Sequence, residues 1–111
     1  MNNEFNDLME KIIAFRDARN WAQFHNPKDL ALSISLEANE LLENYQWSSN
    51  EEALSKLDNI KEELADVLIY CFLFANEYDL DIKEIMLSKL DRNNQKYPVD
   101  KAYNSKKKYN Q

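Results

Sequence analysis

The first apolar positions of the chain follow helical spacing. Phe5, Leu8, Ile12 and Phe15 recur at intervals of three or four residues, so they lie on one side of a helix over about residues 3–20. A helix with one apolar side must pack that side against other parts of the protein. The pattern therefore predicts a first helix that covers a core.

A second helix begins after an irregular, aromatic-rich stretch at residues 21–25. Asn26 has a side chain that caps helices, and Pro27 suits the first helical turn. Asp29 completes this helix start, because acidic residues are favoured in the first turn. We expect this second helix to reach about Tyr45.

The connection to the third helix carries two capping signals. Ser49 and Glu52 have the spacing of a capping box, which predicts a short helix. Asp58 is a candidate cap for the third helix, which the apolar pattern places at about residues 60–78.

The third helix differs from the others because residues 64–75 are apolar on nearly every side. A helix of this kind lies at the centre of a bundle or in a subunit interface, so we expect the protein to self-associate. Asp81 caps a fourth helix that reaches about Asn94 and stops before Pro98.

The composition agrees with a helical chain. The 111 residues include no glycine and two prolines, whereas sheets usually need glycine at their turns. We therefore predict an all-α protein with four main helices in one domain, residues 1–98, followed by a polar, basic tail at residues 99–111.

Charge and hydropathy exclude several classes of protein. The net charge of −6 argues against nucleic acid as a partner. No apolar run is long enough to cross a membrane, and the first ten residues lack the pattern of a signal peptide. The single cysteine, Cys71, leaves no internal disulfide to form. We expect a cytoplasmic protein without a membrane partner.

Two pairs of acidic residues are spaced by one helical turn. Glu37 and Glu40 lie three residues apart on the second helix, as do Glu63 and Asp66 on the third. With 20 acidic residues in the chain, a single pair also fits a solvated helix face. If the two helices pack antiparallel, however, Glu37 faces Asp66. Glu40 then faces Glu63, because both pairs have the same midpoint in the connection.

A cluster of four carboxylates repels itself unless protons or cations neutralise it. Asp66 lies in the most apolar part of the chain, and buried carboxylates are rare unless they are paired or bind a metal. Oxygen ligands without thiolates suit Mg²⁺ or Mn²⁺. A helical di-iron site needs two Glu-x-x-His pairs, and His25 is the only histidine. We predict a magnesium-type site, with a structural acidic cluster as the alternative.

The acidic pairs also carry a family resemblance. Glu37-x-x-Glu40 followed by Glu63-x-x-Asp66 resembles the metal motif of the MazG-type, all-α nucleotide pyrophosphohydrolases. The likeness extends over about residues 15–98, and its Trp21–His25 segment is similar to the dCTP pyrophosphatase branch. Further segments that carry it are Arg19–His25, Asn26–Leu30, Gln46-Trp47, Glu62–Tyr70, Ser88–Asn93 and Tyr97-Pro98.

The resemblance implies a MazG-like four-helix bundle that hydrolyses a nucleoside triphosphate, dCTP or a modified dCTP first, to the monophosphate and pyrophosphate. It also implies Mg²⁺, replaceable by Mn²⁺, on the four carboxylates, and a homodimer or, in this branch, a homotetramer. A chain without glycine has no glycine-rich phosphate loop, so metal and side chains must hold the phosphates. The alternatives are a diphosphatase for another nucleotide and a non-enzymatic helical interaction module with a structural ion.

The same likeness implies contacts with the substrate. Lys89 and Asn93, one turn apart on the fourth helix, would contact phosphate and sugar, with Lys89 also catalytic and Lys96 a further turn along. The positions that match the nucleotide pocket of the branch are Trp21, Phe24, His25, Trp47 and Tyr70. The alternative is an exposed polar face for the fourth helix, plain core for the aromatic residues and helix capping for His25.

Overall fold

A computed structural model describes residues 3–106, and these residues form helices without a strand among them. The long helices, each of at least 15 residues, are α1 (Glu4–Ala18), α2 (Pro27–Glu43), α4 (Leu57–Glu77) and α5 (Ile82–Lys96). The short elements are the 3₁₀ turns η1 (Trp21–Phe24) and η2 (Leu54–Lys56) and the helices α3 (Asn50–Ala53) and α6 (Val99–Ala102). The all-α prediction is confirmed for this part of the chain.

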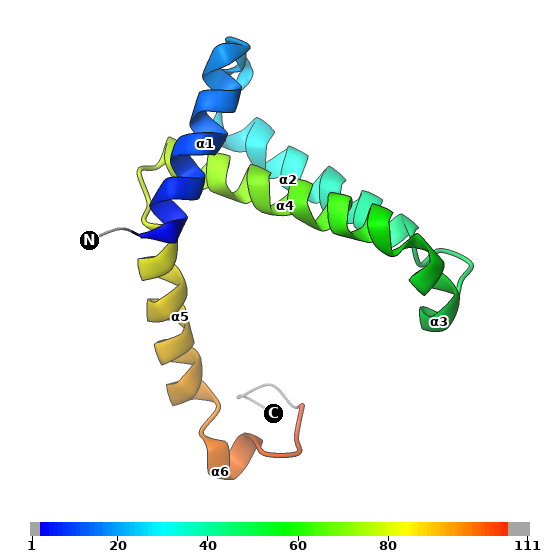
Figure 1. The fold of residues 1–111 in the computed structure, drawn as a ribbon. Helices are drawn as coiled ribbons and strands as arrows, with labels where there is room; N and C mark the ends of the chain where they lie inside the picture. The colour runs from blue at the N-terminus through cyan, green and yellow to red at the C-terminus, as the bar shows by residue number, and fades with distance from the viewer. Residues whose placement is uncertain (1–2, 107–111) are drawn as a thin grey trace. The chain divides into compact units, whose positions relative to one another are not determined.

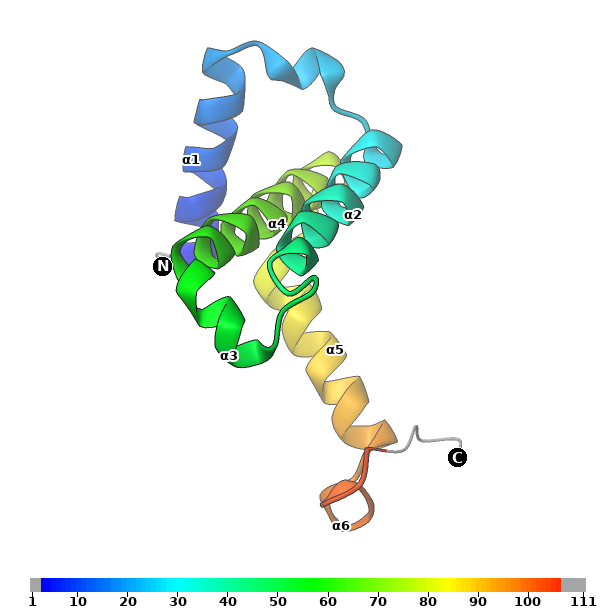
Figure 2. The ribbon, with the colours of Figure 1, turned by 90° about the vertical axis from the view of Figure 1, so that its right-hand side faces the viewer.

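The described residues divide into two compact units, one up to Leu80 and one from Asp81. In the first unit α2 and α4 lie side by side and antiparallel, with α3 in their connection (Figures 1 and 2). Helix α1 packs on α4, where the rings of Phe5 and Phe72 stack with centroids 6.3 Å apart. The second unit contains α5 and α6.

The core of the first unit is small. Its buried apolar side chains are Leu30, Ala53, Phe72, Leu73 and Ala75. Phe72 is therefore buried within the first unit, whereas Leu64 and Leu68 of the same helix are about half exposed. Within residues 3–106 no helix is both long and apolar enough to cross a membrane.

Three predicted helix starts are confirmed. The side chain of Asn26 accepts a hydrogen bond from the amide of Asp29 at 2.9 Å, and Asp81 caps α5 in the same way. Ser49 and Glu52 form both hydrogen bonds of a capping box at the start of α3.

The predicted cap at Asp58 is wrong. Helix α4 already begins at Leu57, and its amide donates to the carbonyl of Leu54 in the preceding 3₁₀ turn. Because η2 runs directly into α4, the first amides of α4 need no side-chain cap. Asp58 instead lies in the first turn of the helix, where its charge is favourable to the helix dipole.

Turns with positive φ are formed here without glycine. Asn20, Asp79 and Asn104 have φ between 54° and 64°, a region that short polar residues tolerate. Trp47 has φ 62° although its side chain is bulky, and that side chain is 94% exposed. Backbone strain at an exposed aromatic residue is typical of a binding position.

The end of the described chain contains more order than a polar tail. Helix α6 follows directly after Pro98, inside the segment that the sequence assigns to the tail. The last part of that segment, residues 107–111, lies outside the described residues. The domain boundary at residue 98 stays a prediction.

Candidate metal centre and adjoining cavity

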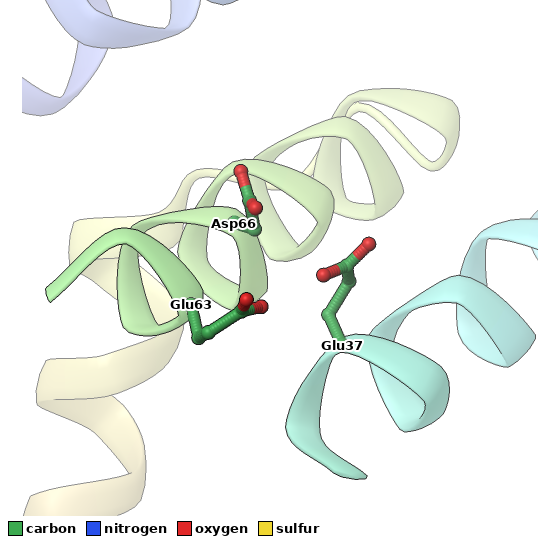
Figure 3. A group of neighbouring side chains, drawn as sticks. All are labelled: Glu37, Glu63 and Asp66. Atoms are coloured by element: carbon green, nitrogen blue, oxygen red, sulfur yellow. The ribbon is translucent and has the colours of Figure 1, made fainter. Parts of the chain in front are cut away.

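Three of the four predicted ligands converge between α2 and α4. Glu37 of α2 faces Glu63 and Asp66 of α4, and one carboxylate oxygen of each lies within 4.8 Å of the others (Figure 3). The antiparallel packing of the two helices brings Glu37 next to Glu63 and Asp66, which lie 26 and 29 positions later in the sequence, as the common midpoint predicts. Figure 3 shows the carboxylates of Glu37 and Glu63 turned toward the space between α2 and α4, with Asp66 beside Glu63 on α4.

Glu40, the fourth predicted ligand, lies beside this group. It interacts with both Glu37 and Glu63, and it contributes to the pKa of each by a side-chain hydrogen bond and by its charge. A hydrogen bond between two carboxyl groups needs a proton on one of them. The four acidic side chains therefore act on one another electrostatically.

The pKa values record this crowding. Burial raises the pKa of Glu37 to about 7, and the hydrogen bond to Glu40 and its charge add to the shift. The charges of Asp66 and Glu63 raise that pKa further. The pKa of Glu63 is also raised, by burial first and then by Glu40 and Asp66. Burial raises the pKa of the Tyr70 hydroxyl, and the nearby carboxylates add to the effect.

The donor set fits a divalent cation. One buried oxygen of Glu37 and one of Glu63 have no hydrogen-bond partner among residues 3–106. In the same part of the chain no lysine or arginine forms an ion pair with these carboxylates. Buried oxygens without partners are costly, and a hard cation with oxygen ligands would satisfy them.

A cavity of about 520 Å³ adjoins the cluster. Glu37 and Asp66 form part of its wall, together with the predicted pocket residues Trp21, His25 and Tyr70. The Nδ1 atom of His25 is buried and has no hydrogen-bond partner within residues 3–106. The cavity thus offers carboxylates, flat rings and an unpaired ring nitrogen in a volume within the usual range for small-molecule sites.

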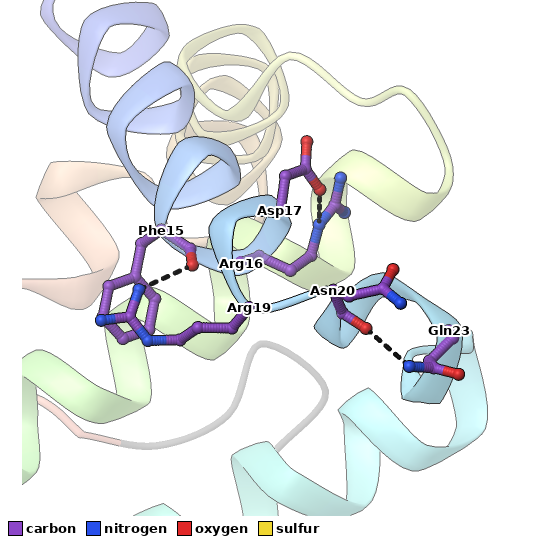
Figure 4. A network of polar contacts seen from close by, with 6 residues as sticks. All are labelled: Phe15, Arg16, Asp17, Arg19, Asn20 and Gln23. Atoms are coloured by element: carbon purple, nitrogen blue, oxygen red, sulfur yellow. Dashed lines mark hydrogen bonds and ion pairs between the residues drawn. The ribbon is translucent and has the colours of Figure 1, made fainter.

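The aromatic wall of the cavity is fixed by contacts at the end of α1. The rings of Phe15 and Trp21 meet edge to face, with centroids 5.6 Å apart. The guanidinium of Arg19 lies 3.8 Å from the centre of the Phe15 ring and donates to the Phe15 carbonyl (Figure 4). These contacts hold Trp21 in place although 44% of it is exposed.

Two basic residues of α1, Lys11 and Arg16, line the cavity and were not identified from the sequence. Arg16 is largely buried, and its Nε donates to Asp17 at 2.9 Å (Figure 4). Its two terminal nitrogens have no partner among the described residues. The signal was weak because both residues flank the apolar stripe of α1, where a solvated cation is equally common.

The other predicted substrate residues lie elsewhere. Phe24 is 66% exposed and, like Trp47, is not part of the cavity wall. Lys89, Asn93 and Lys96 lie on α5, in the second unit. Their roles stay predictions.

The fold and the site define an all-α protein with a cluster of carboxylates, suited to a divalent cation, beside a cavity. Comparison with known proteins makes the class specific, because the chain matches the MazG-like family over residues 32–111. The chain belongs to the MazG-like family.

Its relatives include dCTP pyrophosphatase 1 of Mus musculus, which is 38% identical over 109 residues. The human dCTP pyrophosphatase 1 is 36% identical over the same length. Each match covers 93% of this chain and 64% of the relative, so the chain spans less than two thirds of the length of these proteins. A pyrophosphatase from Archaeoglobus fulgidus has a similar structure, with a TM-score of 0.78, 37% identity, and coverage of 88% of this chain and 95% of that one.

Proposed function

We propose that this protein hydrolyses a nucleoside triphosphate, first of all dCTP or a modified dCTP, to the monophosphate and pyrophosphate in the cytoplasm. The observation that carries the proposal is the convergence of Glu37, Glu63 and Asp66 beside a cavity of nucleotide size. Relatives named dCTP pyrophosphatase support the choice of substrate.

Glu37, Glu40, Glu63 and Asp66 would hold Mg²⁺, which Mn²⁺ could replace. The buried oxygens of Glu37 and Glu63 without a hydrogen-bond partner support this assignment, because a bound cation would satisfy them. The bound ion would neutralise phosphate charge and lower the pKa of a water molecule. The protein's own part is to hold the carboxylates close together without an ion pair to lysine or arginine, so that a cation can take the place of their protons.

The cavity would take the base. Trp21 and Tyr70 supply flat surfaces, and base stacking on such rings tolerates any base. Selection therefore needs hydrogen bonds to the base edge. Cytosine presents two adjacent acceptors, N3 and O2, which match the two free terminal nitrogens of Arg16, whereas thymine and uracil carry a hydrogen on N3. His25 would add a further contact through its unpaired Nδ1.

For the triphosphate and the sugar the family resemblance supplies further assignments. We assign phosphate contacts to Lys89, with a catalytic role, and a sugar contact to Asn93, with Lys96 a turn further along α5. Phe24, exposed at the end of η1, and Trp47, exposed in the turn after α2, would cover the nucleotide. Lys11 adds a cation to the cavity wall.

The active form would be a homo-oligomer, a tetramer or a dimer, in which the helices complete four-helix bundles. Exposed large apolar side chains occur on every long helix, for example Leu36 at 65%, Leu68 at 50% and Leu90 at 57%. Soluble monomers rarely expose so much apolar surface. Leu68→Glu should give monomers by light scattering at micromolar concentration, while Glu62→Gln, an exposed change on the same helix, should leave the assembly intact.

Release of pyrophosphate tests the function directly. The purified protein with Mg²⁺ is assayed against the four common deoxynucleoside triphosphates, the ribonucleotides and 5-methyl-dCTP. We expect the highest kcat/KM for dCTP or 5-methyl-dCTP and no release in EDTA. Preference for a purine would overturn the base assignment alone, and no release from any nucleotide would overturn the enzymatic function.

A further inference from the structure

Asn44, the residue that follows α2, is buried although it is polar. It is 4% exposed, and its Nδ2 donates to the carbonyl of Leu41 at 3.2 Å and more weakly to that of Glu40 at 3.5 Å. The last carbonyls of a helix have no partner within the helix, so this side chain satisfies groups at the end of α2. A buried asparagine with its donors satisfied is a fixed element of structure.

The same residue ties α2 to the start of α4. The Oδ1 of Asn44 accepts a hydrogen bond of 2.8 Å from Asn59, which lies in the first turn of α4. Lys56 donates to the backbone carbonyl of Asn44 at 3.3 Å. In residues 3–80 these are the two side-chain hydrogen bonds that join positions more than four apart.

The asparagine pair follows the same pairing of positions across α2 and α4 as the acidic residues. Positions 44 and 59 have the same midpoint as positions 40 and 63 and positions 37 and 66. Each step along the two antiparallel helices is about one turn. The layer of Asn44 and Asn59 therefore lies directly next to the carboxylate layers.

The carboxylates cannot fix this register themselves. Their oxygens lie within 4.8 Å of one another, so like charges on them repel and hold no register by themselves. A short hydrogen bond between two amides does not tolerate a shift, and buried polar pairs set register between helices in other systems.

We propose that the Asn44–Asn59 pair positions the metal ligands by fixing the register of α2 against α4. The pair keeps the oxygens of Glu37, Glu63 and Asp66 within reach of one ion before the ion binds. The proposal rests on the proposed metal site, and neither asparagine belongs to the carboxylate cluster or to the cavity wall.

The test separates register from stability. Replacing both residues, Asn44→Leu with Asn59→Leu, removes the hydrogen bond between the two amides and leaves an apolar contact between the helices. We expect the metal-free variant to melt below the wild type, because the carbonyls of Leu41 and Glu40 lose the Asn44 amide, so metal binding is measured below both melting temperatures. The Kd for Mn²⁺, measured by calorimetry without nucleotide, should increase roughly 10- to 100-fold, as for other residues that orient metal ligands.

Single changes provide the control if the double variant does not fold. Asn59→Ala is compared with Leu30→Ala, which removes core from the other end of α2, and both are measured below their melting temperatures. Weaker Mn²⁺ binding in Asn59→Ala alone supports the proposal. Equal Kd values in the wild type and the folded asparagine variant, or equal weakening in Leu30→Ala, overturn it. A wild type without Mn²⁺ binding would instead overturn the metal site of the proposed function.

Discussion

The helix pair α2–α4 and the helix α5 each carry residues of the predicted site, but they differ in how far their side chains are buried. The pair buries Leu30 of α2 and Phe72, Leu73 and Ala75 of α4, and its carboxylates already converge. None of the residues of α5 is buried in the described chain. Within the first unit, packing has positioned the carboxylates, whereas the roles assigned to residues of α5 stay proposals.

The strongest challenge to the role of α2–α4 is Asp66→Asn. We expect pyrophosphate release to fall to background, since one ligand and one negative charge are lost. The metal-free variant should melt at the same temperature as the wild type or higher, because a repulsive charge is removed. Asp58→Asn on the same helix is the control and should keep its activity. Retained hydrolysis in Asp66→Asn would mean that the acidic centre is structural.

For α5 the decisive change is Lys89→Ala. If this residue contacts phosphate, kcat should fall by roughly 10- to 100-fold, because phosphate charge changes during the reaction. Melting should not change, because Lys89 is exposed. Lys83→Ala, another exposed lysine of α5, should leave kcat as it is. Equal rates in the two variants would return α5 to the solvated polar face that the sequence also allows.

A third prediction concerns Arg16, which lines the cavity of the first unit and which we assign to the selection of the base. Arg16→Met should lower the preference for dCTP over dTTP by roughly tenfold, the worth of one charge-assisted hydrogen bond. Arg16→Lys keeps the charge and loses the two-pronged geometry, so it should lose selectivity as well. The measurement is the ratio of kcat/KM for the two nucleotides, and an unchanged ratio in both variants would remove Arg16 from base selection.

The smallest effect concerns pH. The pKa of Glu37 is about 7 in the folded protein and 4.5 in the unfolded chain, so its contribution to stability is full below 4.5 and is lost as the pH rises through 7. Metal-free protein in EDTA should therefore melt at a higher temperature at pH 5.5 than at pH 8. Glu37→Gln should reduce this difference, and an unchanged pH dependence would show that Glu37 titrates normally.

Local signals in the sequence predicted much of the fold. The caps at Asn26, Ser49 and Asp81 are chemical signatures that depend on neighbours within four residues, and all three are confirmed. Asp58 has the same chemistry, but the 3₁₀ turn before it replaces the cap, and no local pattern distinguishes the two cases.

In the site, too, some positions could be predicted from the sequence and others depend on tertiary contacts. The common midpoint of the acidic pairs needs only the antiparallel packing of two helices, so their convergence could be predicted. The inward position of Arg16 depends on how α1 rotates against the rest of the unit, and the partners of Asn44 depend on a contact 15 positions away. Neither leaves a periodic pattern in the sequence.

The backbone at Trp47 has a consequence for engineering. A bulky residue with φ 62° costs roughly 1–3 kcal/mol, and glycine would adopt the same conformation freely. Trp47→Gly is thus expected to make the protein harder to unfold while it loses the indole that we assign to the nucleotide. One substitution would thus raise the free energy of unfolding and weaken the proposed binding of the nucleotide.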